Sequence, residues 1–303
     1  MLEVASELVG RKDWPYLQAS VSLREQGSAE WPVTFFASDS PATIHEVVSG
    51  KVQIAIINPS MILKLAALGS RPFKGPLPVR SIAVLPSADR IAFAVRRETG
   101  LSSLAEIRER RFPLRVSLRG QRDHSLHSIV DEALSAAGFT LDDLAAWGGE
   151  VRYDAGMPYA ANRIGAAERG EIDAIFDEGV SAWGHMALEM GMTFLALDGI
   201  LLERLEAAGM RRSLLRQEDF PGLDRDVPTL DFSGWLIYTR AEAPDGLIAD
   251  FCDALEASKA RIPWAREGPL PLAQMVRDSA EGHLEVPLHP AAERTWRERG
   301  YLL

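Results

Sequence analysis

Short apolar runs alternate with amphipathic stretches between residues 17 and 176. The runs have the length of strands, and the stretches show the i, i+3, i+4 spacing of helices. This alternation predicts an α/β fold with mostly parallel sheets. The predicted strands span residues 33–37, 52–57, 81–85, 91–95, 114–118, 151–153 and 172–176, and Leu17–Leu23 is predicted as a shortened first strand.

Capping residues and glycines mark the predicted helices. Ser40 is placed to cap a helix that starts at Pro41 and ends before Gly50. Ser103 and Glu106 have the spacing of a capping box for the next helix. A longer helix ends at Gly138, and its apolar stripe consists of Leu126, Ile129, Val130, Ala133 and Leu134.

Two transitions from helix to strand resemble each other. In residues 49–56 and 169–176, a helix-ending glycine stands two residues before an apolar strand. Polar side chains follow both strands, Asn58 in one case and Asp177-Glu178 in the other. Any α/β protein repeats such a transition, but the similarity of these two segments also fits a protein with two lobes of similar construction.

A series of segments resembles the TAXI family of solute-binding proteins, which serve tripartite TRAP transporters and have the type II periplasmic-binding fold. Each segment is short, and their order and spacing carry the resemblance between about residues 33 and 300. They are residues 37–40, 48–56, 99–107, 116–125, 170–176, 288–294 and 298–300.

The resemblance implies two lobes that are joined by two crossover strands, with a ligand cleft between them. Lobe 1 would comprise residues 1–87 and 199–303, and lobe 2 residues 88–198. The implied function is capture of a small polar or anionic solute by hinge closure, and TRAP membrane subunits would then bind the closed form. We expect a carboxylate-bearing ligand and no cofactor.

Two departures from the family's pattern leave the ligand and the localisation open. The chain has no recognisable glycine-rich loop after its first strand, and residues 119–124 replace a loop of small residues. Its first 16 residues also lack the apolar core of a signal peptide. The family is periplasmic, whereas this sequence is expected to be cytoplasmic unless a signal precedes it.

Composition narrows the classes of partner. Of the 303 residues 47% are apolar and 25% charged, as in ordinary globular proteins, and the net charge of −10 argues against a nucleic-acid surface. No apolar run is long enough to span a membrane. The single cysteine, Cys252, excludes an internal disulfide and a cysteine-based zinc cluster, and its neighbours place it on the buried face of a helix.

Candidate ligand groups lie at two predicted helix N-termini that follow strands, where backbone N–H groups favour anions. One set is Ser38, Asp39 and Ser40, and the other is Gln121 and Ser125. The serines would cap a helix with or without a ligand.

Charged and aromatic residues near the same strand ends complete the candidate site. Arg119 and Arg122 carry guanidinium groups suited to a carboxylate, although either could be solvated or paired with Asp123. The remaining candidates are Asn58, Asp177 and Glu178 as hydrogen-bonding groups and Trp183 as an apolar wall. The last three have structural alternatives, a loop hydrogen bond for the carboxylates and a core position for Trp183.

Metal and catalytic constellations are poorly represented. His124 and His127 share a helix face, but no third ligand is apparent, so we expect no metal site. The common nucleophile, phosphate-binding and zinc-protease motifs are missing from the sequence. A solute-binding protein is therefore favoured over an enzyme. The alternative is a cytosolic enzyme or sensor on the same fold, for example a decarboxylase of an aromatic or dicarboxylic acid.

Overall fold

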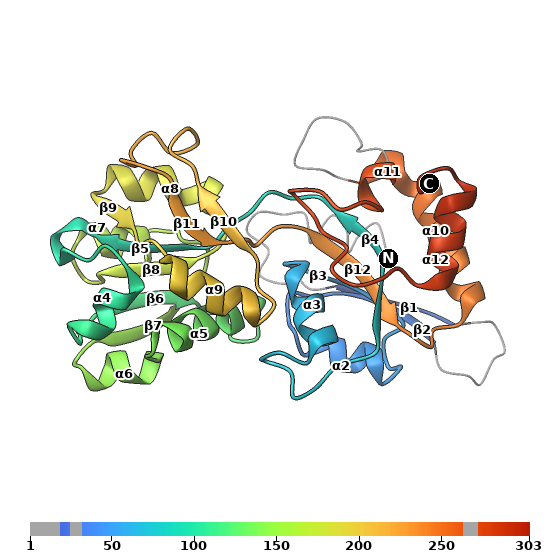
Figure 1. Cartoon of the computed structure of the whole chain (residues 1–303), viewed down its shortest axis with the longest axis horizontal. Helices are drawn as coiled ribbons and strands as arrows, with labels where there is room; N and C mark the ends of the chain where they lie inside the picture. Colours follow the sequence, from blue (N-terminus) through green and yellow to red (C-terminus); the bar gives the residue numbers. More distant parts are fainter. Residues whose placement is uncertain (1–18, 25–31, 263–271) are drawn as a thin grey trace. The chain divides into compact units, whose positions relative to one another are not determined.

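The computed structural model describes residues 19–24, 32–262 and 272–303. Internal packing divides the chain into two units, each built around its own sheet (Figure 1). Unit 1 takes residues up to 69, 75–87 and 234–303, and unit 2 takes residues 70–74 and 88–233.

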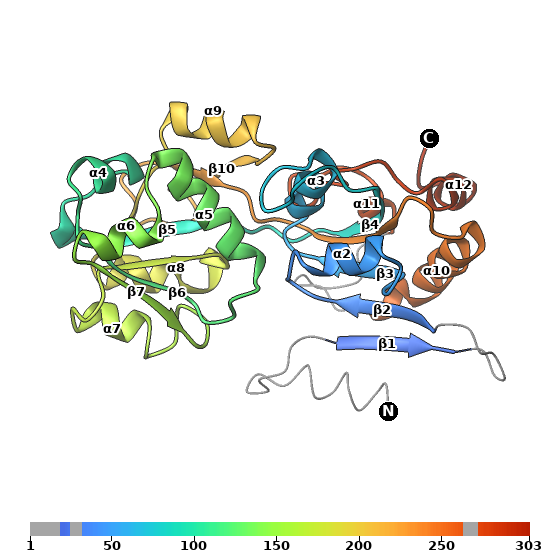
Figure 2. The same ribbon diagram turned by 90° about the horizontal axis from the view of Figure 1, so that it is seen from below.

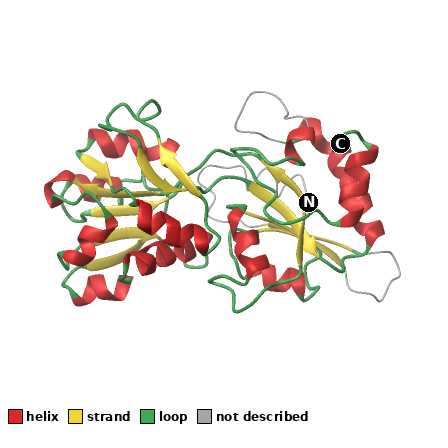
Figure 3. Cartoon of the chain, viewed as in Figure 1, coloured by secondary structure: helices red, strands yellow, loops and turns green. Residues whose placement is uncertain are grey.

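Unit 1 contains a mixed sheet of five strands in the order β1-β2-β3-β12-β4 (Figure 3). Parallel pairing of β2 with β3 brings the carboxyl ends of both strands to one edge. The late strand β12 lies antiparallel between β3 and β4. The strands are β1 (Ala19–Leu23), β2 (Val33–Ala37), β3 (Ile54–Ile57), β4 (Val79–Leu85) and β12 (Trp235–Arg240).

Helices cover both faces of the unit 1 sheet (Figures 1 and 2). On one face, Ile82 and Ile237 of the sheet pack with Cys252 and Trp296, and the indole Nε1 of Trp296 donates to the Ile82 carbonyl oxygen at 2.9 Å. The helices are α2 (Thr43–Val48), α3 (Met61–Leu68), α10 (Asp245–Ser258), α11 (Leu272–Met275) and α12 (Pro290–Glu298), with the 3₁₀ turn η2 (Lys259–Arg261). Cys252 is buried on the apolar face of α10, as predicted.

Unit 2 contains a second five-stranded mixed sheet, in the order β7-β6-β8-β5-β9. β6 runs parallel to β7 and to β8, and β5 runs antiparallel to β8 and β9. The strands are β5 (Ala92–Arg96), β6 (Arg115–Arg119), β7 (Glu150–Asp154), β8 (Ala174–Asp177) and β9 (Met192–Phe194), and β10 (Arg212–Leu215) and β11 (Val227–Leu230) form a separate pair.

The unit 2 sheet also lies between helices, with α4, α5 and α6 on one face and α7 and α8 on the other (Figure 2). Ile164, Val180 and Trp183 of α7 and α8 form a core with Ile175 of β8. The helices are α4 (Leu104–Glu109), α5 (Ser125–Ala137), α6 (Leu141–Ala146), α7 (Ile164–Glu168), α8 (Val180–Glu189) and α9 (Gly199–Ala207), with the 3₁₀ turn η1 (Arg97–Thr99).

The predicted α/β fold class is confirmed, with the difference that both sheets are mixed. Parallel pairs occur where strand and helix alternate, but β12 and β5 enter their sheets antiparallel. The predicted strands agree with the observed ones to within about two residues, and the predicted strand Leu17–Leu23 overlaps β1. Residues 17 and 18 of that prediction, like the residues considered for a signal peptide, lie outside the described ranges.

One capping prediction is wrong and another is half right. The helix expected from Pro41 begins at Thr43, and Ser40 instead accepts a hydrogen bond from the Ala42 N–H at 3.3 Å. Ser103 does cap α4 by accepting from the Glu106 N–H at 3.3 Å. The Glu106 carboxylate, however, accepts from the Ser102 N–H at 2.9 Å, so the box closes one residue earlier than predicted.

The predicted second domain boundary, between residues 198 and 199, differs from the division of the structure. Residues 199–233 belong to unit 2, and the chain returns to unit 1 between Ser233 and Gly234. The reason lies in packing, because α9 contacts α5 and the apolar residues Leu215, Phe220 and Val227 join the unit 2 core.

Candidate functional site

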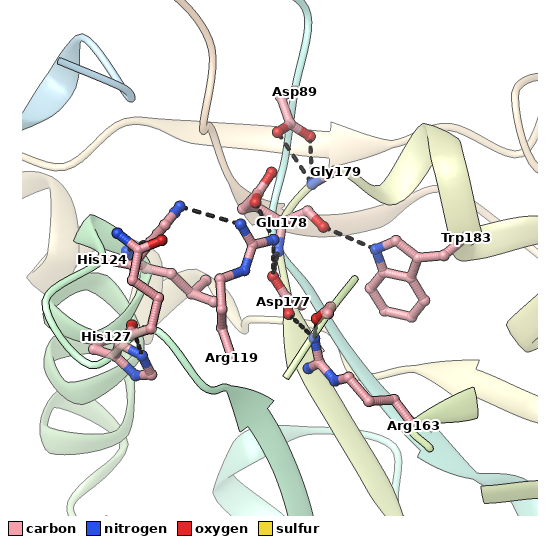
Figure 4. Close-up of polar contacts among 12 residues, drawn as sticks. Asp89, Arg119, His124, His127, Arg163, Asp177, Glu178, Gly179 and Trp183 are labelled. Carbon is pink, nitrogen blue, oxygen red and sulfur yellow. Dashed lines mark hydrogen bonds and ion pairs between the residues drawn. The ribbon is translucent and has the colours of Figure 1, made fainter. Parts of the chain in front are cut away.

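The carboxyl ends of β6 and β8 meet at one edge of the unit 2 sheet, because the two strands are parallel. β6 ends at Arg119 and β8 ends at Asp177. With three further residues they form the β8 cluster, shown in Figure 4, which consists of Asp89, Arg119, Arg163, Asp177 and Glu178.

Asp177 lies at the centre of the β8 cluster with its side chain fully buried. Its Oδ1 accepts from Arg119 Nη2 at 2.7 Å, and its Oδ2 accepts from Arg163 Nη1 at 2.6 Å. Arg163 is also fully buried, and its Nε donates to Ser117 Oγ at 3.0 Å. Two guanidinium groups thus bind one carboxylate. A buried charge needs such partners, because it has lost its contact with water.

Glu178 provides the second carboxylate for Arg119, and the two form a close ion pair. The Arg119 side chain is 14% exposed and the Glu178 side chain 11%, so both reach the surface of unit 2. Arg119 Nε, in contrast, is buried and has no hydrogen-bond partner within the described ranges. Such a donor is uncommon in proteins.

Asp89 approaches the β8 cluster from the segment where the chain enters unit 2. Both of its carboxylate oxygens accept from the Gly179 N–H, at 2.9 and 3.0 Å. Burial raises the pKa of Asp89 well above its ordinary value, and the adjacent Glu178 carboxylate raises it further. The four charged groups joined by ion pairs in the β8 cluster are the guanidinium groups of Arg119 and Arg163 and the carboxylates of Asp177 and Glu178.

His124 connects the β8 cluster to the start of α5. Its Nδ1 caps the helix by accepting from the Leu126 N–H at 3.1 Å, and its Nε2 lies 3.1 Å from Arg119 Nη1. Burial lowers the pKa of His124 to about 3, and the nearby Arg119 charge contributes. The imidazole is therefore neutral at physiological pH.

Trp183 supports the β8 cluster from within the core. Its Nε1 donates to the Glu178 carbonyl oxygen at 2.8 Å, and its side chain is fully buried against Phe194. The structure places Trp183 in the apolar core of unit 2 instead of at an exposed wall. Its contact with the site is through the backbone of Glu178.

The other predicted residues of unit 2 surround α5 without joining the β8 cluster. The Arg122 guanidinium lies 3.4 Å from the ring centroid of Tyr153, which is a cation–π geometry. Gln121 accepts through its backbone carbonyl oxygen from His127 Nε2, 2.9 Å away. Ser125 is the first residue of α5 and is fully buried, while the helix cap is His124.

The predicted residues of unit 1 lie at the carboxyl ends of β2 and β3. Ser38 and Ser40 are buried and bonded to each other, with the Ser40 N–H donating to Ser38 Oγ at 3.1 Å, and Asp39 stands between them. Asn58 is buried after β3, and its Nδ2 donates to the Gly234 carbonyl oxygen at 3.1 Å. The parallel pairing of β2 with β3 brings these side chains to one edge of the sheet.

Sequence reasoning did not identify Asp89, His124 or Arg163 as ligand-site residues. His124 carried a local signal, because it precedes a helix and histidine can cap one with Nδ1. Asp89 and Arg163 reach Glu178 and Asp177 across 89 and 14 positions of sequence. No spacing rule connects such pairs.

Two kinds of feature are absent from the part of the chain that the structure describes. Among these residues, no group of three or more histidine, cysteine or carboxylate side chains is arranged to hold a metal ion. None of the helices in the described ranges is both long and apolar enough to cross a bilayer.

Comparison with known proteins gives one family match and several similar folds. Residues 26–300 match the model of the NMT1-like family. The alkanesulfonate-binding protein SsuA from Xanthomonas axonopodis pv. citri, bound to MOPS, is 15% identical with a TM-score of 0.32, and the match covers 73% of this chain and 63% of that chain. XAC2383 from Xanthomonas citri, bound to ATP, is 15% identical with a TM-score of 0.44, and the match covers 86% and 80% of the two chains.

Proposed function

Because the chain belongs to the NMT1-like family, we propose that it is a solute-binding protein and not an enzyme. Its solute is a small molecule that carries a carboxylate and an amino or hydroxyl donor. The β8 cluster of unit 2 is the first site of contact.

The observation that carries this proposal is the unsatisfied Nε of Arg119. Leaving a buried donor without a partner costs about 1–3 kcal/mol. A carboxylate oxygen of the solute that accepts from Nε would remove that cost. The guanidinium fork is suited to this contact, because it can hold Asp177 with one edge and a ligand with another.

The ion pairs within the β8 cluster support the second half of the solute description, the amino or hydroxyl donor. Arg119 and Arg163 are already matched by Asp177 and Glu178, so a ligand with a carboxylate alone would add an uncompensated charge. A protonated amino group that pairs with the partly exposed Glu178 carboxylate offsets this charge, and a hydroxyl group there adds a hydrogen bond without adding charge.

Unit 1 carries a second set of candidate ligand groups. Ser38, Asp39, Ser40 and Asn58 gather at the end of its parallel strands and offer hydroxyl, amide and backbone groups. A solute bound by both units favours the closed arrangement by its differential affinity. Delivery to a TRAP-type transporter remains part of the proposal on the sequence resemblance alone.

A thermal-shift screen with amino acids, hydroxy acids and simple carboxylates tests the proposal. We expect one of the first two classes to raise the melting temperature and to bind by calorimetry. Arg119→Lys retains the charge but loses Nε and the fork, so affinity should fall by about tenfold or more.

Arg115→Lys is the matched control, because Arg115 pairs with Asp173 at the opposite end of β6 and β8. This variant should bind normally. Full affinity in Arg119→Lys would refute the role of Arg119, and conversion of the bound solute, seen by mass spectrometry, would favour the enzyme alternative.

A further inference from the structure

We propose that unit 2 has a second binding site, lined by none of the residues of the β8 cluster, for a small organic anion with a planar ring. It is a surface cavity of about 470 Å³, here called the α4–α6 pocket. It is lined by Arg108, Glu109, Arg111, Gly138, Asp143 and Trp147. These residues come from the end of α4, the end of α5, and α6 with the residue that follows it.

The α4–α6 pocket holds two uncommitted guanidinium groups. The side chains of Arg108 and Arg111 make no hydrogen bond or ion pair with any described residue, although the chain carries a net charge of −10. The Arg108 guanidinium rests against the backbone of Gly138, where an added Cβ would lie 3.0 Å from its Nε. Two guanidinium groups at one cavity suit an oxyanion, and the Glu109 carboxylate, which also lines it, reduces the positive charge there.

Arg111 occupies a backbone conformation with positive φ, which Glu285 is the only other described residue besides glycines to adopt. It follows α4 with φ of +44°. The helices α2, α3, α5, α6, α7, α8, α9 and α12 are each followed within two residues by a glycine with φ between +71° and +104°. A side chain in this region carries a cost that glycine avoids. In the proposed site, the Arg111 side chain is kept at this position for contact with the ligand.

Trp147 supplies the surface for the ring. Its indole is half-buried and packs against Phe139, with the ring centroids 5.8 Å apart. That packing limits the motion of the indole and leaves part of it on the pocket. The Asp143 carboxylate is committed to the start of α6, where it accepts from the Thr140 N–H and hydroxyl at 2.8 Å each.

These features together define the ligand as a planar ring that carries a carboxylate or a phosphate monoester. The ring stacks on Trp147, and the oxyanion lies between Arg108 and Arg111. Benzoate and adenosine 5′-monophosphate represent the two forms of the anion. Binding of either one supports the site, and the stronger of the two identifies the anion.

The test is calorimetry of the full chain with both probes. Arg111→Gly should weaken binding by about tenfold or more, because one charged hydrogen-bond donor is lost. Its melting temperature should equal or exceed that of the unsubstituted protein, since glycine is preferred at this backbone conformation. Trp147→Phe should retain more affinity than Trp147→Ala.

Two control variants distinguish binding in the α4–α6 pocket from a general effect of charge and from binding at the β8 cluster. Arg225→Gly makes the same change of charge at an exposed loop position outside the pocket, and it should bind both probes normally. Arg119→Lys should also leave probe binding unchanged, so this site and the proposed function fail independently. Absence of binding at millimolar probe, or full affinity in Arg111→Gly, would overturn the inference.

Discussion

Replacement of Arg163 by methionine tests the buried ion pairs of the β8 cluster. Methionine fills much of the same volume but removes the charge. Asp177 Oδ1 then keeps Arg119 and the Glu178 N–H, but Oδ2 loses Arg163, and the Gly156 carbonyl oxygen loses the donor that lies 3.1 Å away. Breaking a buried pair costs about 3–5 kcal/mol. Because Arg119 still binds Oδ1, we expect the lower end of that range, about 3 kcal/mol of unfolding free energy.

Urea unfolding followed by tryptophan fluorescence measures this loss, and the melting temperature should fall by about 6–12 °C. Adding Asp177→Asn removes the buried negative charge that Arg163→Met leaves with one of its two guanidinium partners, so the double variant should be more stable than Arg163→Met alone. Arg169→Met breaks the exposed pair with Glu171 and should change nothing measurable. A loss in Arg163→Met that is no larger than in this control would refute the reasoning.

Three further predictions concern titration and reactivity. The pKa of His124 is lowered to about 3 in the folded protein, so the unfolded chain binds more protons below about pH 6.5 and the free energy of unfolding falls on acidification. In urea unfolding, His124→Asn should reduce the fall in unfolding free energy between pH 7 and 5 by about 2 kcal/mol. An unchanged fall would contradict this prediction. Asp89 has a raised pKa, which stabilises the fold at low pH and loses that contribution as pH rises, so the stability of Asp89→Asn relative to the unsubstituted protein should grow from pH 5 to 8. Burial raises the pKa of the Cys252 thiol to about 12, so a thiol reagent at pH 8 should label it only after urea is added, and rapid labelling of the folded protein would show that the α10 packing is wrong.

Local signals in the sequence predicted the elements well, because they depend on spacing and on a few special residues. The stripe of α5 and its terminal Gly138 are examples. The rule that parallel strands share a carboxyl edge also brought Arg119 and Asp177 to one place, as the structure shows. What the rule could not give is that these two residues bind each other, which depends on side-chain reach.

The features that the sequence did not predict depend on packing between residues that are far apart in the chain. The pattern of α9 resembles that of any amphipathic helix, so nothing local assigns it to unit 2. The start of α2 was predicted from Ser40 and Pro41, but the Ser40 hydroxyl is used by the turn that precedes the helix. Arg163 in a loop could equally have been solvated, and only the assembled fold shows that it is buried beside Asp177.

The position of β12 has a consequence for the order in which the chain can fold during synthesis. β12 lies between β3 and β4, yet about 150 residues separate it from β4 in sequence. Until Trp235–Arg240 has left the ribosome, β3 and β4 lack the strand that pairs with both of them. Unit 2 is complete by residue 233, so nascent unit 2 has every strand of its sheet while unit 1 still waits for its central one. The test is a stalled nascent chain that ends near residue 233 and is extended by a linker long enough to bring this residue out of the ribosome. In this chain, unit 2 should resist protease, whereas the unit 1 strands should be cleaved.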